Sequence, residues 1–376
     1  MNAAWSSARS ILAVRLDGIG DLLMTTPALR ALKEAHPARS ITLLASPAGA
    51  ALARELPFVD DVVAFVAPWM KCAETGASTP EATRALAAQL RERGFDAAVV
   101  FTVCTQSALP AAMLVYEAGI PLRAAYAREN PYALLTDWRP ESDVALAYGM
   151  RHEVLRQIDL VQSLGVDVRD RRLQFPVRPD ARRAMREKAD ARGLDARRRW
   201  LVVHPGASAS SRRYPEAKLA AAVRMLAAKG RWQIAIAGDE GDRRAAEAIA
   251  ASVRGVVPIA GCLDLAEFGA LLEAADALVC NNSSPAHLAA AVGTPVVDLY
   301  ALTNPQHTPW GVAHRVLSHD VDCRWCLKST CPHGHQRCLA DVAPGAIVAA
   351  VDALLAPKAN RRETPHAASA VATTAP

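Results

Sequence analysis

The sequence has no long hydrophobic run. No window of its 376 residues approaches the ~18–20 uninterrupted apolar residues that a membrane-spanning helix needs. The stretch from Met1 to Ser10 is mixed and polar, and the apolar residues that follow it are interrupted by Arg15 and Asp17. A signal peptide is therefore not apparent, and we expect a cytoplasmic protein.

A strong excess of charge of one sign is also absent. The formal net charge of +5 is spread along the chain and favours at most anionic ligands or a membrane surface, so we expect no nucleic-acid partner. The arginine-rich stretch "VRPDARRAMREKADARGLDARRR" has acidic residues throughout, which indicates a solvated helix and linker. Hydrophobic residues make up 51% and charged residues 22%, as in ordinary globular proteins.

Short apolar runs alternate with longer helical patterns along the first half of the chain. The predicted strands are Ile11–Leu16, Ile41–Ala45, Val62–Phe65, Ala97–Thr102 and Arg123–Tyr126. The predicted helices are Thr26–Ala35, Gly49–Glu55, Thr79–Arg93, Ser107–Ala118 and Met150–Leu164. This alternation predicts a parallel sheet that is covered by helices on both faces.

The same alternation restarts at "WLVVHPG", Trp200 to Gly206, and continues through "WQIAIAG", "DALVC" and "TPVVDLY" with helical patterns between them. We therefore expect an α/β protein with two doubly wound domains, residues 1–180 and 181–356. The tail 357–376 is polar and rich in Ala, Thr and Pro, which predicts disorder. In open α/β sheets ligands bind beyond the carboxyl ends of the strands, so the loops at these ends are the candidate sites.

The first such loop is "DGIGD" in "ILAVRLDGIGDLLMTTPALRAL". Gly18 and Gly20 supply the first two glycines of a dinucleotide-binding fingerprint, but Leu23 stands where the third is needed. The second strand also lacks the carboxylate that would hold a ribose, and no Gly-Lys-Ser/Thr of a P-loop follows. Asp21 is then either a carboxylate favoured by a helix N-terminus or a general base, and local sequence leaves both open.

Two loops of the second half suit a phosphate ligand. "HPGASASSRRYP" combines Gly206, three serines and the pair Arg212–Arg213, although a solvated polar loop has the same composition. In "CNNSSPAHLAAAVGTPVV", polar residues end a strand and Pro285 opens a helix whose free N–H groups would face a ligand. His287 lies on the first turn of that helix, where it contacts either ligand or protein.

Four segments, in their order along the chain, resemble the motifs of glycosyltransferase family 9, the ADP-heptose heptosyltransferases of lipopolysaccharide core synthesis. These segments are "RLDGIGDLLMTTPALRAL", "VVHPGASASSRRYP", "AGDEGD" and "NNSSPAHLAAAVGTPVV". The resemblance covers about residues 11–351. It implies a GT-B fold, in which two Rossmann-like domains face a cleft and bind the acceptor and the nucleotide-sugar. It also implies an inverting transfer that needs no cofactor, with peripheral contact at the inner membrane left open.

The resemblance assigns roles to individual residues. The family's base falls on Asp21, and Asp17 receives no role. The implied donor-binding residues are Ser208, Arg212, Glu240, Asn282, Ser283, Ser284 and His287. Asn282 and Ser284 depart from the family's Asp and Gly, which puts the choice of sugar and nucleotide in question.

Four cysteines lie close together in "CRWCLKSTCPHGHQRC", at Cys323, Cys326, Cys331 and Cys338. In a reducing compartment this spacing favours a structural zinc or iron site, with free thiols or a local disulfide as alternatives. The cluster is similar to a subgroup of the family that includes iron-containing protein heptosyltransferases of autotransporter adhesins. It follows the last predicted core strand, so we expect it to lie away from the chemistry.

Three functions stay open on the sequence. The first is a heptosyltransferase that acts on a lipopolysaccharide-core sugar, another glycan or glycolipid, or a protein side chain. The second is an epimerase or hydrolase of nucleotide-sugars on the same fold. The third is a non-catalytic protein that binds nucleotide-sugars.

Overall fold

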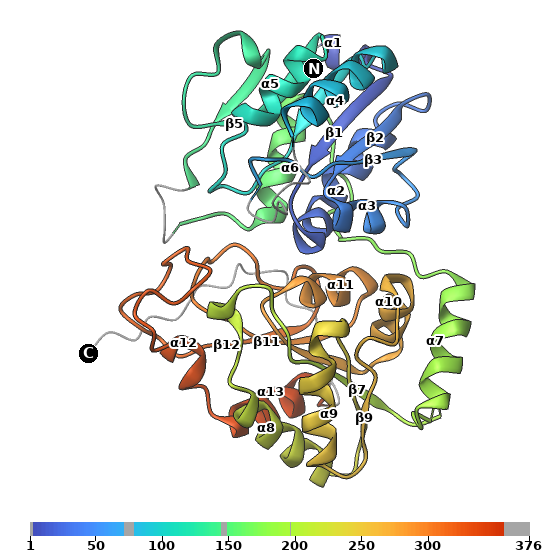
Figure 1. Ribbon diagram of the computed structural model, residues 1–376, viewed down its shortest axis with the longest axis vertical. Helices are drawn as coiled ribbons and strands as arrows, with labels where there is room; N and C mark the ends of the chain where they lie inside the picture. Colours follow the sequence, from blue (N-terminus) through green and yellow to red (C-terminus); the bar gives the residue numbers. More distant parts are fainter. Residues whose placement is uncertain (1–2, 71–78, 144–148, 196, 357–376) are drawn as a thin grey trace, which may run out of the picture.

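The computed structural model describes residues 3–70, 79–143, 149–195 and 197–356 (Figure 1). In this part of the chain, two six-stranded sheets lie one above the other along the long axis of the molecule. Every strand pairing in both sheets is parallel. The expected α/β class with two doubly wound parallel sheets is therefore confirmed. The predicted tail 357–376 lies outside the described residues.

The N-terminal sheet has the strand order β3-β2-β1-β4-β5-β6. Its strands are β1 (Ser10–Arg15), β2 (Ser40–Ala45), β3 (Asp61–Ala64), β4 (Ala97–Val100), β5 (Leu122–Ala127) and β6 (Asp137–Pro140). The helices of this half are α1 (Ala3–Ser7), α2 (Ile19–Glu34), α3 (Pro47–Ala53), α4 (Pro80–Arg93), α5 (Leu109–Glu117) and α6 (Glu153–Ser163), with a 3-10 turn η1 (Tyr132–Leu134).

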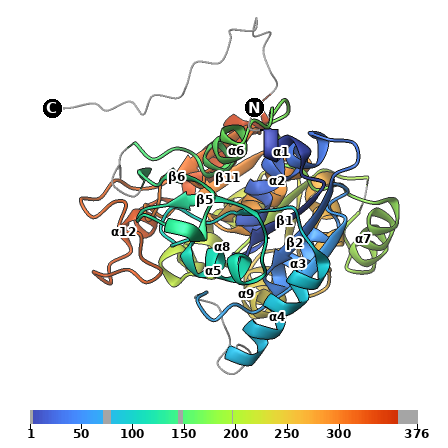
Figure 2. The same ribbon diagram turned by 90° about the horizontal axis from the view of Figure 1, so that it is seen from above.

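The C-terminal sheet has the order β12-β11-β10-β7-β8-β9. Its strands are β7 (Trp200–His204), β8 (Gln233–Ile236), β9 (Val256–Pro258), β10 (Ala277–Asn281), β11 (Val296–Leu299) and β12 (His314–Leu317). The remaining elements are α7 (Pro179–Ala191), η3 (Ser210–Arg212), α8 (Glu216–Ala228), η4 (Glu240–Asp242), α9 (Arg243–Ala251), α10 (Leu265–Ala274), α11 (Ser284–Val292), α12 (Arg337–Ala340) and α13 (Pro344–Leu355). Figure 2 shows α7 at one side of the molecule and α12 at the opposite side.

The central strands are buried on both faces because helices cover each sheet. All residues of β4 and β10 are buried, which accounts for their continuous apolar sequences. The strands that the sequence pattern missed are β6, β9 and β12. They are short and only partly buried, so they carry little hydrophobic periodicity.

Helix α2 begins earlier than the sequence pattern predicted. It starts at Ile19, inside the "DGIGD" loop, and passes through Pro27. The imide nitrogen of Pro27 cannot donate to the carbonyl of Leu23, and the hydroxyl of Thr26 donates to that carbonyl instead at 2.7 Å. The Thr26 hydroxyl thus satisfies the carbonyl that Pro27 cannot, and the helix continues. The early start of α2 places Asp21 in its first turn.

Each sheet has one point where the strand order reverses, between β1 and β4 in the first and between β7 and β10 in the second. Such switch points are where doubly wound sheets bind ligands. The loops after β1 and β10 meet at the interface of the two halves, since the N–H of Gly20 donates to Ser284 Oγ at 3.2 Å. Among the described residues, no helix combines the length and the hydropathy that crossing a membrane requires.

Candidate functional site

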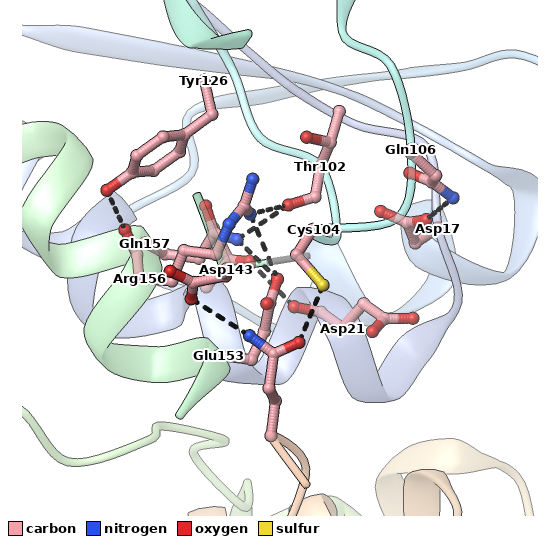
Figure 3. Close-up of polar contacts among 12 residues, drawn as sticks. Asp17, Asp21, Thr102, Cys104, Gln106, Tyr126, Asp143, Glu153, Arg156 and Gln157 are labelled. Carbon is pink, nitrogen blue, oxygen red and sulfur yellow. Dashed lines mark hydrogen bonds and ion pairs between the residues drawn. The ribbon is translucent and has the colours of Figure 1, made fainter. Parts of the chain in front are cut away.

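A buried arginine, Arg15, organises the loop after β1. Its guanidinium forms ion pairs with Asp17 at 3.0 Å, with Glu153 at 3.2 Å and with Asp21 at 3.6 Å. The Arg15 side chain is fully buried, so the three carboxylates supply the charge compensation that water cannot. Figure 3 shows these three carboxylates, Asp17, Asp21 and Glu153.

Asp21 has the properties of a general base. Its side chain is 26% exposed, whereas those of Asp17 and Glu153 are almost completely buried. Burial raises the pKa of Asp21, and the nearby charges of Arg15 and Arg212 oppose that shift. A carboxylate with a raised pKa binds a proton more readily, and its partial exposure leaves it accessible to a substrate hydroxyl.

A second layer of charged groups fixes Glu153 in place. Gln157 donates to Glu153 at 2.5 Å, and Arg156 lies 3.8 Å from the same carboxylate. Arg156 also pairs with Glu141 and donates to the carbonyl of Thr102 at the end of β4. Helix α6 is thereby tied to the segment after β4, the strand that pairs with β1, and buried contacts set the position of Glu153.

Gly20 allows the two halves to approach closely. A side-chain carbon at this position would lie 2.9 Å from the His287 ring and 3.3 Å from the Cα of Ser284. A residue without Cβ is therefore required where α2 meets the N-terminus of α11. Ser284, one of the two departures from the family pattern, accepts the hydrogen bond from Gly20 across this interface.

Several buried donors converge near Asp21 from the C-terminal half. Arg212 Nε, His287 Nδ1 and His307 Nε2 are buried and have no hydrogen-bond partner among the described residues. Burial lowers the pKa of His287 to about 3, so its ring is neutral and carries a single N–H. The charge of Arg212 acts on Asp21, His287 and His307 alike, which places all four groups in one electrostatic cluster. Unpaired buried polar groups of this kind suit an oxygen-rich ligand.

The polar residues before α11 mainly support the loops. Asn281 accepts from the N–H of Tyr214 and donates to the carbonyls of Pro205 and Gly206, so it braces the loop after β7. Asn282 accepts from the N–H of Ala301, and Ser283 donates to the carbonyl of Asn281. The Asn282 side chain is thus engaged by the protein backbone in this structure.

Ser208 and Glu240 lie outside the cluster. Both are exposed, and Glu240 pairs with Arg243 at 2.5 Å. The carboxylate that faces the loop after β7 is that of Asp242, because a Cβ on Gly206 would come within 2.2 Å of its oxygen. The structure therefore brings Gly20, Asp21, Arg212, Ser284 and His287 together and leaves Ser208 and Glu240 apart.

The cysteine loop contacts the loop after β7. The hydroxyl of Ser211 donates to the carbonyl of Lys328 at 2.9 Å, and Gln336 donates to the carbonyl of Ser210 at 3.0 Å. These contacts hold η3, the turn that carries Arg212. This loop folds back over the first loop of the C-terminal sheet, whereas the location of the cluster away from the chemistry stays a prediction.

The four thiols line one small cavity of about 20 Å³ together with His335. Burial alone would raise the pKa of Cys331, but four backbone N–H groups of residues 333–336 lower it. Within the described ranges, however, no three His, Cys, Asp or Glu side chains form a group that could hold a metal ion. The structure therefore does not show the metal centre that the spacing suggests.

Sequence reasoning missed Arg15, Glu153 and His307. It also missed Gln106, which donates to Asp17 at 2.6 Å, and the buried Asp298, on which the charge of Arg212 acts. Arg15 carried a usable signal, because a charged residue at the end of an otherwise apolar strand needs a buried partner. Glu153 is separated from Arg15 by 138 positions, and nothing in its local sequence predicts the contact.

The architecture and the converging side chains define a glycosyltransferase in which two doubly wound domains face each other. Residues 83–336 match the model of glycosyltransferase family 9 (heptosyltransferase), and the chain belongs to this family. Lipopolysaccharide heptosyltransferase 2 of Escherichia coli strain K12 is 27% identical over 357 residues, which is 92% of this chain and 98% of that protein.

Two solved structures confirm the fold. A family 9 glycosyltransferase of Veillonella parvula DSM 2008 has a TM-score of 0.77 at 18% identity and covers 94% of this chain. The E. coli ADP-heptose lps heptosyltransferase II has a TM-score of 0.70 at 24% identity and covers 92%. The alignment spans 98% of each of these chains, so the GT-B arrangement applies to the whole described molecule.

Proposed function

We propose that this glycosyltransferase transfers a heptose from ADP-heptose to a sugar of the lipopolysaccharide core or of another glycan, with inversion at the anomeric carbon. The observation that carries the proposal is the meeting of a basic carboxylate, Asp21, with the buried donors Arg212 and His287 at the junction of two switch points. The names of the similar heptosyltransferases support heptose and ADP-heptose as the substrates.

In the proposed reaction, Asp21 removes the proton from the acceptor hydroxyl. The oxygen attacks the anomeric carbon, the bond to the nucleotide phosphate breaks, and the electron pair leaves with the pyrophosphate. Arg212 and the N–H groups at the start of α11 neutralise the developing negative charge. His287, which is neutral, can add one N–H to the same ligand.

We also propose roles for the remaining predicted residues. The domains 1–180 and 181–356 would bind the acceptor and the donor, and Ser208, Glu240, Asn282 and Ser283 would contact the donor after a shift of their loops. The protein would work in the cytoplasm, where nucleotide-sugars are made, with peripheral contact to a membrane that carries the acceptor. Protein side chains are the alternative acceptors.

Replacement of the base tests the mechanism. The variant Asp21→Asn should lose about 10²–10⁴-fold in kcat, because the amide cannot accept the proton. ADP-heptose should still raise the melting temperature of the variant, since the donor-binding groups are intact. Asp61→Asn, the same change at the distant exposed pair with Arg93, is the control and should keep full activity. Undiminished release of sugar or epimer by Asp21→Asn without an acceptor would favour an epimerase or hydrolase instead.

The donor is tested by a thermal-shift series with ADP-, GDP-, UDP- and dTDP-sugars. A shift specific to ADP-heptose supports the proposal. A shift specific to a UDP-sugar would overturn the choice of nucleotide, and the absence of a shift with every one of them would contradict binding of a nucleotide-sugar donor.

We further propose that Cys323, Cys326, Cys331 and Cys338 hold a structural zinc or iron ion. The support is the shared cavity of the four thiols and the lowered pKa of Cys331, which favours the thiolate form that metals bind. Metal content measured by mass spectrometry should be stoichiometric in the purified protein and lost in Cys331→Ser. It should be retained in Cys262→Ser, which changes a half-buried cysteine elsewhere. A metal-free wild-type protein would contradict the proposal.

A further inference from the structure

A cavity of about 290 Å³ opens at the switch point of the N-terminal sheet, between the ends of β1 and β4. Its walls come from these strand ends, from the segment that follows β3 and from the start of α5. Among the described lining residues, Asp17 alone is charged, and none of the roles assigned above uses it. This is the position at which doubly wound sheets hold ligands.

We propose that this cavity binds the accepting sugar residue, and that Asp17 accepts hydrogen bonds from its hydroxyls and selects an uncharged sugar over an acidic one. The inference rests on the proposed glycosyl transfer and names the class of acceptor for it.

Asp17 is held in place by the protein and still has capacity for a ligand. Gln106 donates to its Oδ1 at 2.6 Å (Figure 3). Arg15 pairs with its Oδ2 at 3.0 Å. A carboxylate has about four lone-pair sites, so these two contacts leave room for two hydroxyl donors. The side chain is only 6% exposed, and a bound hydroxyl would therefore compete with little water.

The other walls suit a sugar ring. Thr102, Thr105 and Ser107 bring hydroxyl groups, whereas Trp69 and Phe101 bring aromatic surface. Rings of this kind cover the apolar C–H face of a sugar, while the polar groups take its hydroxyls.

The charges of the cavity disfavour an acidic ligand. Its described lining residues include no lysine, arginine or histidine. Arg15, which pairs with Asp17, is already shared by three carboxylates. Among the described lining residues, a carboxylate or phosphate on the ligand would therefore meet the negative charge of Asp17 and no side chain of positive charge.

The cavity lies beside the proposed base. Arg15 touches both Asp17 and Asp21, so one guanidinium links the cavity to the reacting carboxylate. A sugar held through Asp17 is thereby kept next to the group that would deprotonate it. Asp17 is a binding and positioning residue in this scheme, and Asp21 is the base.

Binding of methyl glycosides to the full-length protein, followed by saturation-transfer NMR, tests the inference directly. A neutral methyl heptoside or mannoside should give a signal, and a methyl glucuronide should not. Asp17→Asn should weaken the neutral ligand about 10–100-fold, because a hydrogen bond to a charged group is lost. Asp17→Asn should also reduce the difference in affinity between the neutral and the acidic ligand. Equal binding of both ligands by the wild type would overturn the selectivity.

Kinetics separate this inference from the proposed reaction. Asp17→Asn and Gln106→Leu should both raise KM for the acceptor while KM for ADP-heptose stays within about twofold, and Asp61→Asn should change neither. An unchanged KM for the donor also shows that each variant is folded. If Asp17→Asn does not fold, Gln106→Leu still tests the cavity, because it keeps the ion pair between Arg15 and Asp17. Transfer with an unchanged acceptor KM in both variants would overturn the inference alone. Neutral-glycoside binding without any transfer from ADP-heptose would overturn the proposed reaction alone.

Discussion

At the scale of single residues, the site depends on the balance around Arg15. One buried guanidinium pairs with Asp17, Asp21 and Glu153. Three carboxylates therefore share one positive charge. Burial raises the pKa of Asp17 to about 6 and raises that of Glu153 as well, although Arg15 and Arg156 oppose both shifts. The cluster thus titrates closer to neutrality than ordinary carboxylates do.

This balance predicts the pH dependence of the reaction. A carboxylate with a raised pKa takes up a proton at a higher pH than usual, and the protonated form can neither act as a base nor receive two hydroxyl donors. We expect kcat/KM to fall as the pH decreases through about 6, where Asp17 becomes protonated. The charges of Arg15 and Arg156 act on Asp17, and those of Arg15 and Arg212 act on Asp21. A flat profile in a stably folded sample would contradict this assignment.

Single motifs could be predicted from the sequence, but the partners that tune them could not. Asp21, Arg212 and His287 each follow or begin a recognisable strand or helix, and the structure does bring them to one place. Glu153 and Gln106 join the cluster through long-range contacts, for which a single sequence gives no distance information.

At the scale of elements, the close approach of α2 and α11 sets the geometry at the interface. The helices meet where Gly20 faces Ser284 and His287. The early start of α2 was missed because a proline inside the pattern suggests a helix boundary, and only the Thr26 contact explains why the helix continues. The buried central strands of the two sheets could be predicted, since buried parallel strands are almost continuously apolar.

Gly20→Ala tests this approach. The new methyl group would meet the His287 ring at 2.9 Å, and the helices would have to move apart. We expect a loss of about 1–3 kcal/mol in the free energy of unfolding, measured by urea denaturation, with a large loss of transfer activity. Gly345→Ala in α13 is the matched control, because its methyl group has no neighbour nearer than 3.9 Å. Wild-type activity in Gly20→Ala would show that the close contact is dispensable.

At the scale of the whole molecule, one loop of the C-terminal half enters the N-terminal half. The Oε1 of Gln306 accepts from the Cys104 thiol at 2.9 Å, and its amide group donates to the carbonyl of Arg151 at 2.9 Å. The ring of His152 contacts the carbonyl of Thr308 nearby at 2.8 Å. The sequence predicted the two halves separately. It could not place them relative to each other, because these contacts join residues more than a hundred positions apart.

Gln306→Ala tests how firmly the halves are joined. The variant removes the hydrogen bonds to the buried Cys104 thiol and to the part-buried carbonyl of Arg151, so we expect the free energy of unfolding to fall by about 1–3 kcal/mol. The unfolding curves recorded by circular dichroism and by tryptophan fluorescence should also no longer coincide, because the halves would unfold separately. Gln89→Ala on the exposed side of α4 is the control and should behave as wild type. Unchanged, coincident transitions in Gln306→Ala would show that other contacts hold the halves together.

The two switch points face each other, yet each is built by a different part of the chain. Changes in the walls around Asp17 need not disturb the loops around Arg212, and the reverse also holds. If the N-terminal half binds the acceptor and the C-terminal half the donor, as proposed, the architecture provides two separable sets of residues: one could adapt to a new accepting glycan while the other keeps the same activated sugar. Domain exchange between relatives would be a practical route to new specificities.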